Sequence, residues 1–173
     1  MQRKRFAIAL VGAGTVALIA AGGLASPATA SASTTATKHC TIVLAPIAAG
    51  ESTSKVVSRE CSASPATAKD TRILIMTWYK DDNYNGDSTD IRAQGSAPCD
   101  GQGYGISDVS AGPFGFTWGN AISSFKVWND CYTTTAYTGT NYGGRSQTYN
   151  GNVANVGPAM NDQINSFRTR SPA

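Results

Sequence analysis

The sequence predicts an all-β protein built from two copies of one unit. The pattern Tyr-x4-Tyr-x-Gly-x-Ser occurs twice, and each copy is followed by a similar polar loop ahead of an apolar stretch. The segment from Arg72 to Tyr79 reads RILIMTWY, and a near-continuous apolar run of this length fits a buried strand better than a helix. Between Cys40 and Cys61, two β-branched runs flank a Gly-containing loop, which is typical of a hairpin.

The repeated unit has an opening and a closing motif. A repeat of this size is usually one supersecondary unit that needs its copy to bury its apolar face, so two copies predict one domain. The closing motifs are Gly119–Phe125 and Asn161–Phe167, which include Ser124 and Ser166. The opening motifs are Tyr79, Tyr84, Gly86 and Ser88 in the first copy, and Tyr137, Tyr142, Gly144 and Ser146 in the second.

The opening motif predicts a tight fold-back of the chain. Gly86 and Gly144 are expected to supply positive φ angles, which a residue with a Cβ resists. The aromatic side chain before each glycine is expected to cover the turn. Ser88 and Ser146 are expected to bond backbone groups that the turn leaves unpaired.

The closing motif places Asn, Asp and Ser side chains in a loop just ahead of an apolar strand. These are hard oxygen ligands of the kind that calcium takes. Together the two motifs resemble the Greek-key motif of the βγ-crystallin superfamily, in particular its microbial, secreted, calcium-binding members. The resemblance covers roughly Arg72 to Arg170 and includes two motifs, the number that fills one domain in that family. It implies two four-stranded Greek keys packed as a sandwich, with two calcium sites at one end.

The resemblance also implies the ligands. In the family each ion is clamped crosswise, by loop oxygens of one motif, a Ser or Thr hydroxyl of the other, and main-chain carbonyls of the hairpin. Carried over by position, the loop ligands are Asn120 and Ser123 in the first motif and Asp162 and Asn165 in the second, with carbonyl donors near Lys80 and Thr138.

Three departures from the family pattern predict weak or single-site calcium binding. Gly119 stands where the family prefers Asn or Asp, and Asn165 stands where Ser or Thr is expected. The first copy is also longer, with 36 residues from Gly86 to Ile122 against 20 from Gly144 to Ile164.

Residues 1–30 have the pattern of a secretory signal peptide: a basic start, an apolar run and a small-residue cleavage sequence, Ala28-Thr29-Ala30. A secreted, extracellular protein is therefore expected. Three of the 14 Lys and Arg residues lie in this segment, which leaves 11 against 11 Asp and Glu. The near-neutral remainder gives no support for nucleic-acid binding or for membrane binding after cleavage.

The expected domain organisation follows the composition. Residues 31–70 comprise a flexible lead-in, the disulfide-bonded hairpin and a Ser/Ala/Pro-rich linker, and residues 71–173 form the βγ-crystallin-like domain. Four cysteines allow three pairings, and Cys40–Cys61 with Cys99–Cys131 closes the shortest loops. Export favours disulfides over metal thiolates, and the chain has no Cys-x-x-Cys pair for zinc.

The sequence offers little for catalysis, and the protein is not expected to be an enzyme. His39 is its only histidine, so a Ser-His-Asp site without it cannot be assembled. The acidic segment KDDNYNGDSTD is expected to be an exposed hairpin, since no Glu stands six residues after Gly86 as an EF-hand requires.

The expected function is that of a secreted, monomeric protein that binds calcium for structural stability. One alternative is a proteinase inhibitor or toxin-like protein on the same fold, which would contact an extracellular protease through the long insertion Ala93–Phe116 or through the N-terminal hairpin. A third is a module that binds carbohydrate or a cell-wall component through exposed aromatic side chains. The aromatics in question are Tyr79, Trp118, Trp128, Tyr132, Tyr137, Tyr142 and Tyr149, and packing is the preferred role for those within the repeat.

Overall fold

The structure is a computed structural model that describes residues 38–62, 72–95, 97–110 and 118–173. The predicted signal peptide, most of the predicted linker and part of the long insertion lie outside the described residues. Within the described part of the chain, no helix is both long and apolar enough to cross a bilayer.

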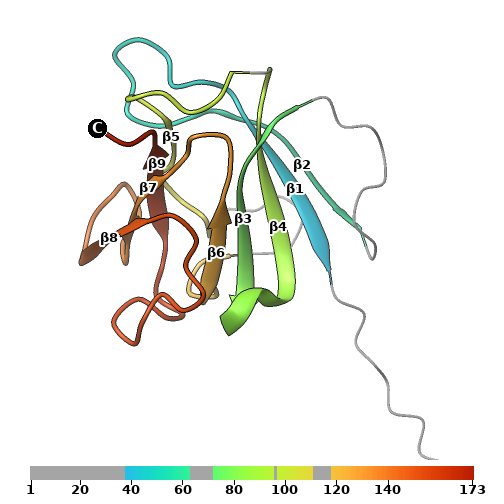
Figure 1. Cartoon of the computed structure of the whole chain (residues 1–173), viewed down its shortest axis with the longest axis vertical. Helices are drawn as coiled ribbons and strands as arrows, with labels where there is room; N and C mark the ends of the chain where they lie inside the picture. Colours follow the sequence, from blue (N-terminus) through green and yellow to red (C-terminus); the bar gives the residue numbers. More distant parts are fainter. Residues whose placement is uncertain (1–37, 63–71, 96, 111–117) are drawn as a thin grey trace, which may run out of the picture. The chain divides into compact units, whose positions relative to one another are not determined.

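The predicted all-β fold is confirmed, with two sheets (Figure 1). The first has the strand order β2-β1-β4-β3-β6, and the second has the order β5-β9-β7-β8. The strands are β1 (His39–Leu44), β2 (Val56–Ser62), β3 (Leu74–Asp81), β4 (Asn85–Ala93), β5 (Tyr104–Ile106), β6 (Ser124–Val127), β7 (Thr133–Tyr137), β8 (Ser146–Asn150) and β9 (Ser166–Arg170), and a short 3-10 turn, η1 (Asp82–Tyr84), joins β3 to β4.

The two repeats exchange segments between the sheets. Strand β5 comes from the first repeat but pairs with β9 of the second, and Val153 of the second repeat forms a bridge with Phe125 in β6 of the first. The insertion Ala93–Phe116, the expected contact loop of an inhibitor, therefore includes a strand that the second sheet requires. Tyr104, which begins β5, is buried.

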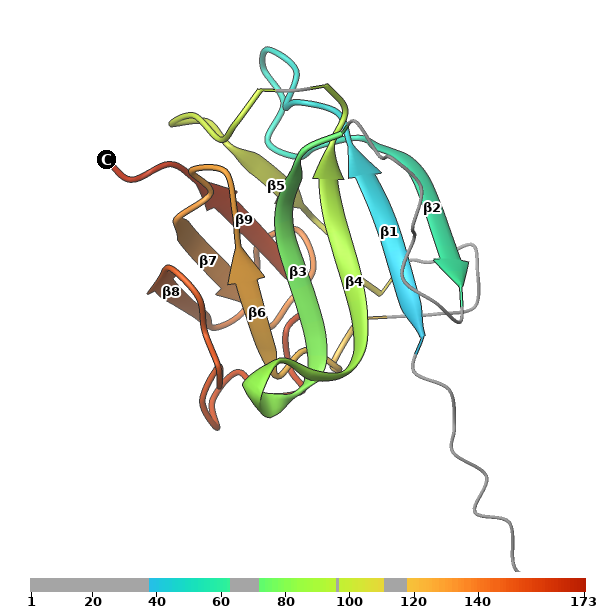
Figure 2. The same cartoon turned by 45° about the vertical axis from the view of Figure 1, so that its right-hand side comes forward.

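The predicted N-terminal hairpin is confirmed as β1 and β2, which pair antiparallel with Cys40 opposite Cys61. It also extends the first sheet, because β1 pairs in parallel with β4 (Figure 2). Ile42 and Leu44 of β1 belong to the core, and Leu44 is fully buried. The hairpin therefore shares the core of the repeat domain.

Side chains from both sheets meet in one core. The predicted buried strand is β3, in which Ile75, Met76 and Trp78 are at most 1% exposed. The Trp78 ring packs edge-on against Phe167 of the second sheet, with 4.6 Å between ring centroids. Both predicted disulfides, Cys40–Cys61 and Cys99–Cys131, are confirmed.

The two opening motifs fold into matching hairpins. Gly86 and Gly144 have φ angles of 76° and 77°, as predicted. A Cβ at Gly144 would lie 2.5 Å from the Thr138 hydroxyl oxygen, so the turn also requires a residue without a side chain at this position. The tyrosines of each motif pack edge-on, with 5.7 Å between the Tyr79 and Tyr84 centroids and 5.6 Å between those of Tyr137 and Tyr142.

The serines that form hydrogen bonds with the backbone of these hairpins are not the predicted ones. Ser88 bonds His39, and Ser146 lies exposed in β8. Instead, the Ser124 hydroxyl donates to the Asp81 carbonyl at 2.6 Å and accepts from the Tyr84 N–H. Ser166 makes the equivalent bonds to Gly139 and Tyr142. The prediction failed because these serines reach the turns from a strand distant in sequence.

Candidate metal site

The closing loops of the two repeats lie beside each other and beside the hairpins. The Ser123 N–H donates to the Tyr79 carbonyl at 3.0 Å, and the Asn120 N–H donates to the Ile164 carbonyl of the other loop at 3.2 Å. Asn120 and Asp162 hold equivalent left-handed positions, with φ angles of 57° and 54°. Both residue types tolerate this conformation better than most.

The structure brings together the crosswise pairs that the resemblance implied. The Ser123 hydroxyl oxygen lies 3.4 Å from Asp162 Oδ1, and Asn165 Nδ2 lies 2.9 Å from Asn120 Oδ1. We call the group around Asp162 and Ser123 the first loop pair, and the group around Asn120 and Asn165 the second loop pair.

The first loop pair surrounds a polar pocket that combines side chains of η1 with those of both loops. Two residues that line it, Asp82 and Asn161, each have a buried oxygen atom, Oδ1, without a hydrogen-bond partner. The remaining polar atoms of these side chains are engaged: Asn155 donates to Asp82 Oδ2 at 2.6 Å, and Asn161 Nδ2 donates to Asp162 Oδ2 at 2.9 Å. The pocket is lined by Lys80, Asp81, Asp82, Asn120, Ala121, Ser123, Asn161 and Asp162.

The charge of this pocket is negative but spread out. Three carboxylates line it, while the ammonium group of Lys80 lies 3.4 Å from Asp87. Across the described ranges, no three His, Cys, Asp or Glu side chains converge into a metal-binding group. An ion here would therefore depend on amide, hydroxyl and main-chain oxygens as well as on carboxylates.

The second loop pair is arranged differently. Asn165 Nδ2 donates to Asn120 Oδ1 at 2.9 Å, to the Thr138 carbonyl at 2.8 Å and to the Gln163 carbonyl at 3.3 Å. The sequence predicted an oxygen ligand at Asn165, but the structure places its nitrogen among the other oxygens. The prediction named the residue type and its position, which do not fix the orientation of an amide.

Two residues of the first loop pair were not predicted as ligands, Asp82 and Asn161. A comparison of the two repeats could have identified them, because the first hairpin has Asp81 and Asp82 where the second has Gly139 and Thr140. Asn161 likewise stands where the other loop has Gly119. These substitutions concentrate the oxygen-bearing side chains on one side.

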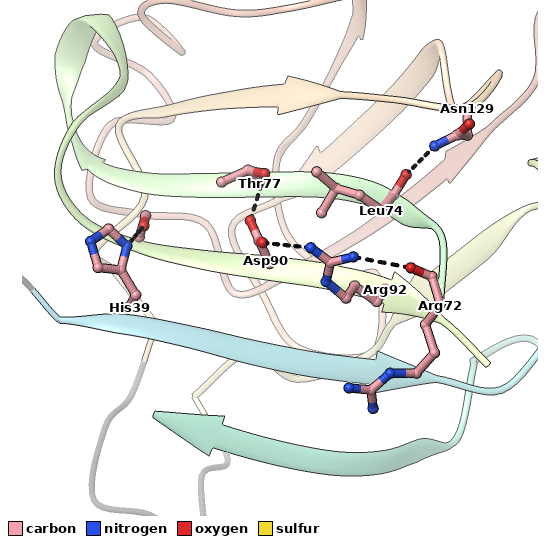
Figure 3. Close-up of polar contacts among 8 residues, drawn as sticks. His39, Arg72, Leu74, Thr77, Asp90, Arg92 and Asn129 are labelled. Atoms are coloured by element: carbon pink, nitrogen blue, oxygen red, sulfur yellow. Dashed lines mark hydrogen bonds and ion pairs between the residues drawn. The ribbon is translucent and has the colours of Figure 1, made fainter. Parts of the chain in front are cut away.

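His39 of β1 contacts a hydroxyl group of β4, and Asp90 of the same strand bonds other residues (Figure 3). Its Nδ1 lies 2.6 Å from the Ser88 hydroxyl. Asp90, two residues further along β4, accepts a hydrogen bond from Thr77 at 2.9 Å and pairs with Arg92 at 3.2 Å. In Figure 3 this carboxylate faces Thr77 and Arg92.

The aromatic side chains divide into packed and exposed groups. Trp118 is buried, and Tyr149 donates its hydroxyl to the Val156 carbonyl at 2.6 Å. Burial raises the pKa of Tyr149 to about 12. Trp128 and Tyr132, on the connection between β6 and β7, are 41% and 48% exposed.

Comparison with known proteins returns no matching family model and no matching curated protein. Similar solved structures are βγ-crystallin domains. One is from Flavobacterium johnsoniae, with 23% identity and a TM-score of 0.43 over 57% of this chain and 97% of that chain. Another is a double mutant of a domain from Clostridium beijerinckii, with 25% identity and a TM-score of 0.45 over 58% of this chain and 100% of that chain. The N-terminal domain of Protein S has 21% identity and a TM-score of 0.42 over 56% of this chain and 96% of that chain.

This chain has a βγ-crystallin-like fold. Its own features carry that conclusion: the two opening motifs form matching hairpins, each repeat lends a segment to the sheet of the other, and the closing loops meet beside the hairpins. The β1–β2 hairpin is an addition to the two repeats, because it precedes them in the chain and extends the first sheet.

Proposed function

We propose that the protein binds one calcium ion in the first loop pair and that the ion stabilises the βγ-crystallin-like domain. The observation that carries the proposal is that two residues lining one pocket, Asp82 and Asn161, each have a buried oxygen atom without a hydrogen-bond partner. Burial of an unpaired polar atom is costly, more so when it belongs to a charged group. A hard cation that takes several oxygen ligands would remove this cost.

The residues of the first loop pair fit such an ion. Asp82 and Asp162 supply carboxylate oxygens, Asn161 an amide oxygen, and Ser123 a hydroxyl oxygen. The main-chain carbonyl of Lys80 is a further donor implied by the family resemblance. Because the donor set has few charges in close contact, we expect modest affinity.

We also propose that the protein works outside the cell. The signal-peptide pattern of residues 1–30 supports export, and both disulfides are typical of proteins from oxidising compartments. Extracellular calcium is abundant enough for a site of modest affinity to be useful, since extracellular modules bind calcium with Kd values of roughly 10⁻⁴–10⁻³ M.

Calorimetric titration with calcium chloride tests the site. Wild type should bind one ion, and Asp82→Asn should weaken binding about tenfold or more, because it removes a negative charge at nearly constant volume. Asp130→Asn is a matched control, since Asp130 is exposed and lies outside the pocket. The proposal is wrong if wild type binds no calcium or if both variants bind it equally well.

Two other functions compete with this proposal. The exposed pair Trp128 and Tyr132 favours carbohydrate binding, because aromatic rings offer flat apolar surfaces to sugars. Carbohydrate binding would be supported if a cell-wall polysaccharide column retained wild type but not the double variant Trp128→Ala/Tyr132→Ala. A proteinase inhibitor on the same fold is tested by a panel of extracellular proteases.

A further inference from the structure

The second loop pair holds a side-chain nitrogen at the position where the first holds a pocket. Asn165 Nδ2 is within 3.3 Å of three oxygen atoms from three separate segments: the first closing loop, the second hairpin and the second closing loop. We propose that this amide takes the place of a cation, so that the second loop pair is closed by hydrogen bonds and binds no calcium. The inference deepens the proposed calcium function, because it sets the number of sites at one.

The chemistry of the amide matches this role. The NH₂ group carries two donor hydrogens with partial positive charge, and the atoms around it, Asn120 Oδ1 and the carbonyls of Thr138 and Gln163, are all acceptors. An ion at this place would have to displace the nitrogen and break these bonds. The second hairpin also offers no carboxylate in compensation, since Gly139 and Thr140 replace Asp81 and Asp82.

Gly119 provides the space that the closed arrangement needs. A Cβ at Gly119 would lie 2.8 Å from Asn165 Oδ1 and 2.6 Å from the Ser110 Cβ. A side chain there would therefore push Asn165 out of its place. The two departures from the family motif in this loop pair, Gly119 and Asn165, thus form one structural change.

The first loop pair shows the opposite arrangement at the same positions. Ser123, the counterpart of Asn165, has a short hydroxyl arm that lies 3.4 Å from Asp162 Oδ1. Asn161, the counterpart of Gly119, brings a buried amide oxygen without a partner. The first loop pair therefore leaves oxygens unpaired, while the second satisfies its oxygens with the amide group of Asn165.

The test replaces the amide nitrogen by oxygen at constant shape, with Asn165→Asp. In chelator, this variant should melt about 3–8 °C below wild type, because a carboxylate then faces three other oxygens. Calcium should restore the loss, and calorimetry should count one more ion than in wild type. Asn150→Asp is the matched control: Asn150 is exposed and uses its oxygen to accept from Thr133, so the variant should behave like wild type.

Nuclear magnetic resonance of wild type gives a readout that needs no variant. The side-chain NH₂ signals of Asn165 should exchange slowly with water and should stay in place when calcium is added. Large calcium-induced shifts of these signals, or two ions bound by wild type, would overturn the inference while leaving calcium binding intact. The inference would also be overturned if Asn165→Asp and the control Asn150→Asp had the same melting temperature in chelator.

The remaining outcomes separate the inference from the proposed function. If wild type binds no calcium but Asn165→Asp binds one ion, the inference stands and the proposed function fails. If Asn165→Asp does not fold, Asn165→Ser, which introduces the residue type of the first repeat, replaces it and should also melt below wild type in chelator.

Discussion

At the level of residues, the two hairpins differ at equivalent positions. One example is Asp82 of the first hairpin, which corresponds to Thr140 of the second. The first hairpin has a carboxylate with an unpaired buried oxygen at this position, while the second has a hydroxyl group. The same bias holds at the loop positions, so the first loop pair collects the anionic groups. The contrasting positions are Asp81 and Gly139, Asp82 and Thr140, Asp162 and Asn120, Asn161 and Gly119, and Ser123 and Asn165.

This asymmetry predicts unequal effects of two alanine substitutions on calcium-dependent stability. Calcium bound only to the folded state should stabilise it by about 2.7 kcal/mol when free calcium is a hundredfold above Kd. Asp162→Ala should remove most of the calcium-dependent rise in melting temperature, because it removes a carboxylate of the first loop pair. Asn120→Ala should remove little of it, because Asn120 Oδ1 already accepts from Asn165. Equal losses in calorimetric melts with calcium and with chelator would contradict this ranking.

Tyr149 predicts a dependence of stability on alkaline pH. Burial raises its pKa from an ordinary value of 10 to about 12, so the folded state holds the phenol proton more tightly than the unfolded state. The resulting stabilisation is complete below about pH 10 and is lost as pH rises through about 12. Tyr149→Phe should therefore lower the free energy of unfolding by about 1 kcal/mol at pH 8 through loss of a hydrogen bond. It should also make the decline between pH 10 and 12 shallower.

Urea titrations at a series of pH values measure this effect. Tyr132→Phe is the control, since the Tyr132 ring is 48% exposed. A pH profile for Tyr149→Phe that parallels wild type would show that this phenol does not cause the alkaline loss.

At the level of elements, the two disulfides stabilise different parts of the fold. Cys40–Cys61 joins neighbouring strands of the N-terminal hairpin, and Cys61 is exposed. Cys99–Cys131 fastens the segment before β5 to the segment before β7, and its two cysteines are 5% and 1% exposed. Only the second bridge has both of its cysteines within the core.

Removing the second bridge should therefore cost more stability than removing the first. The loops they close span 32 and 21 residues, and loop-closure entropy alone gives about 3–4 kcal/mol for each. Replacing both buried cysteines by alanine also leaves a cavity, which adds roughly 1 kcal/mol or more. Urea unfolding of the two double Cys→Ala variants measures the difference, and a larger loss for the hairpin bridge would contradict the ranking.

At the level of the whole molecule, the exchange of segments makes the two repeats mutually dependent. The second sheet lacks an edge strand without β5, and β6 loses its bridge without Val153. The N-terminal hairpin joins the same core through Ile42 and Leu44. The second repeat cannot complete its sheet from its own residues, and the second repeat in turn bridges β6 of the first sheet.

We therefore expect one cooperative unfolding transition. Tryptophan fluorescence, which reports on the core around Trp78 and Trp118, and far-ultraviolet circular dichroism should give coincident urea curves. Calcium should shift both curves together, because the first loop pair joins both repeats. Two separated transitions would show that the repeats unfold independently.

Features that depend on short stretches of chain could be predicted from the sequence. Gly86 and Gly144 take positive φ because the fold-back requires it locally, and the apolar run of β3 is buried because nearly all of its residues are apolar. The spacing of four cysteines was enough to choose the correct pairing. The twofold repeat was visible because both copies keep the same turn chemistry.

Features that depend on contacts between distant segments could be seen only in the folded structure. It assigned the turn-bonding role to Ser124 and Ser166, and it made part of the long insertion a strand of the second sheet. It also turned the nitrogen of Asn165 toward the oxygens of Asn120, Thr138 and Gln163. The orientation of an amide depends on which donors and acceptors surround it, and those neighbours come together only when both repeats have folded.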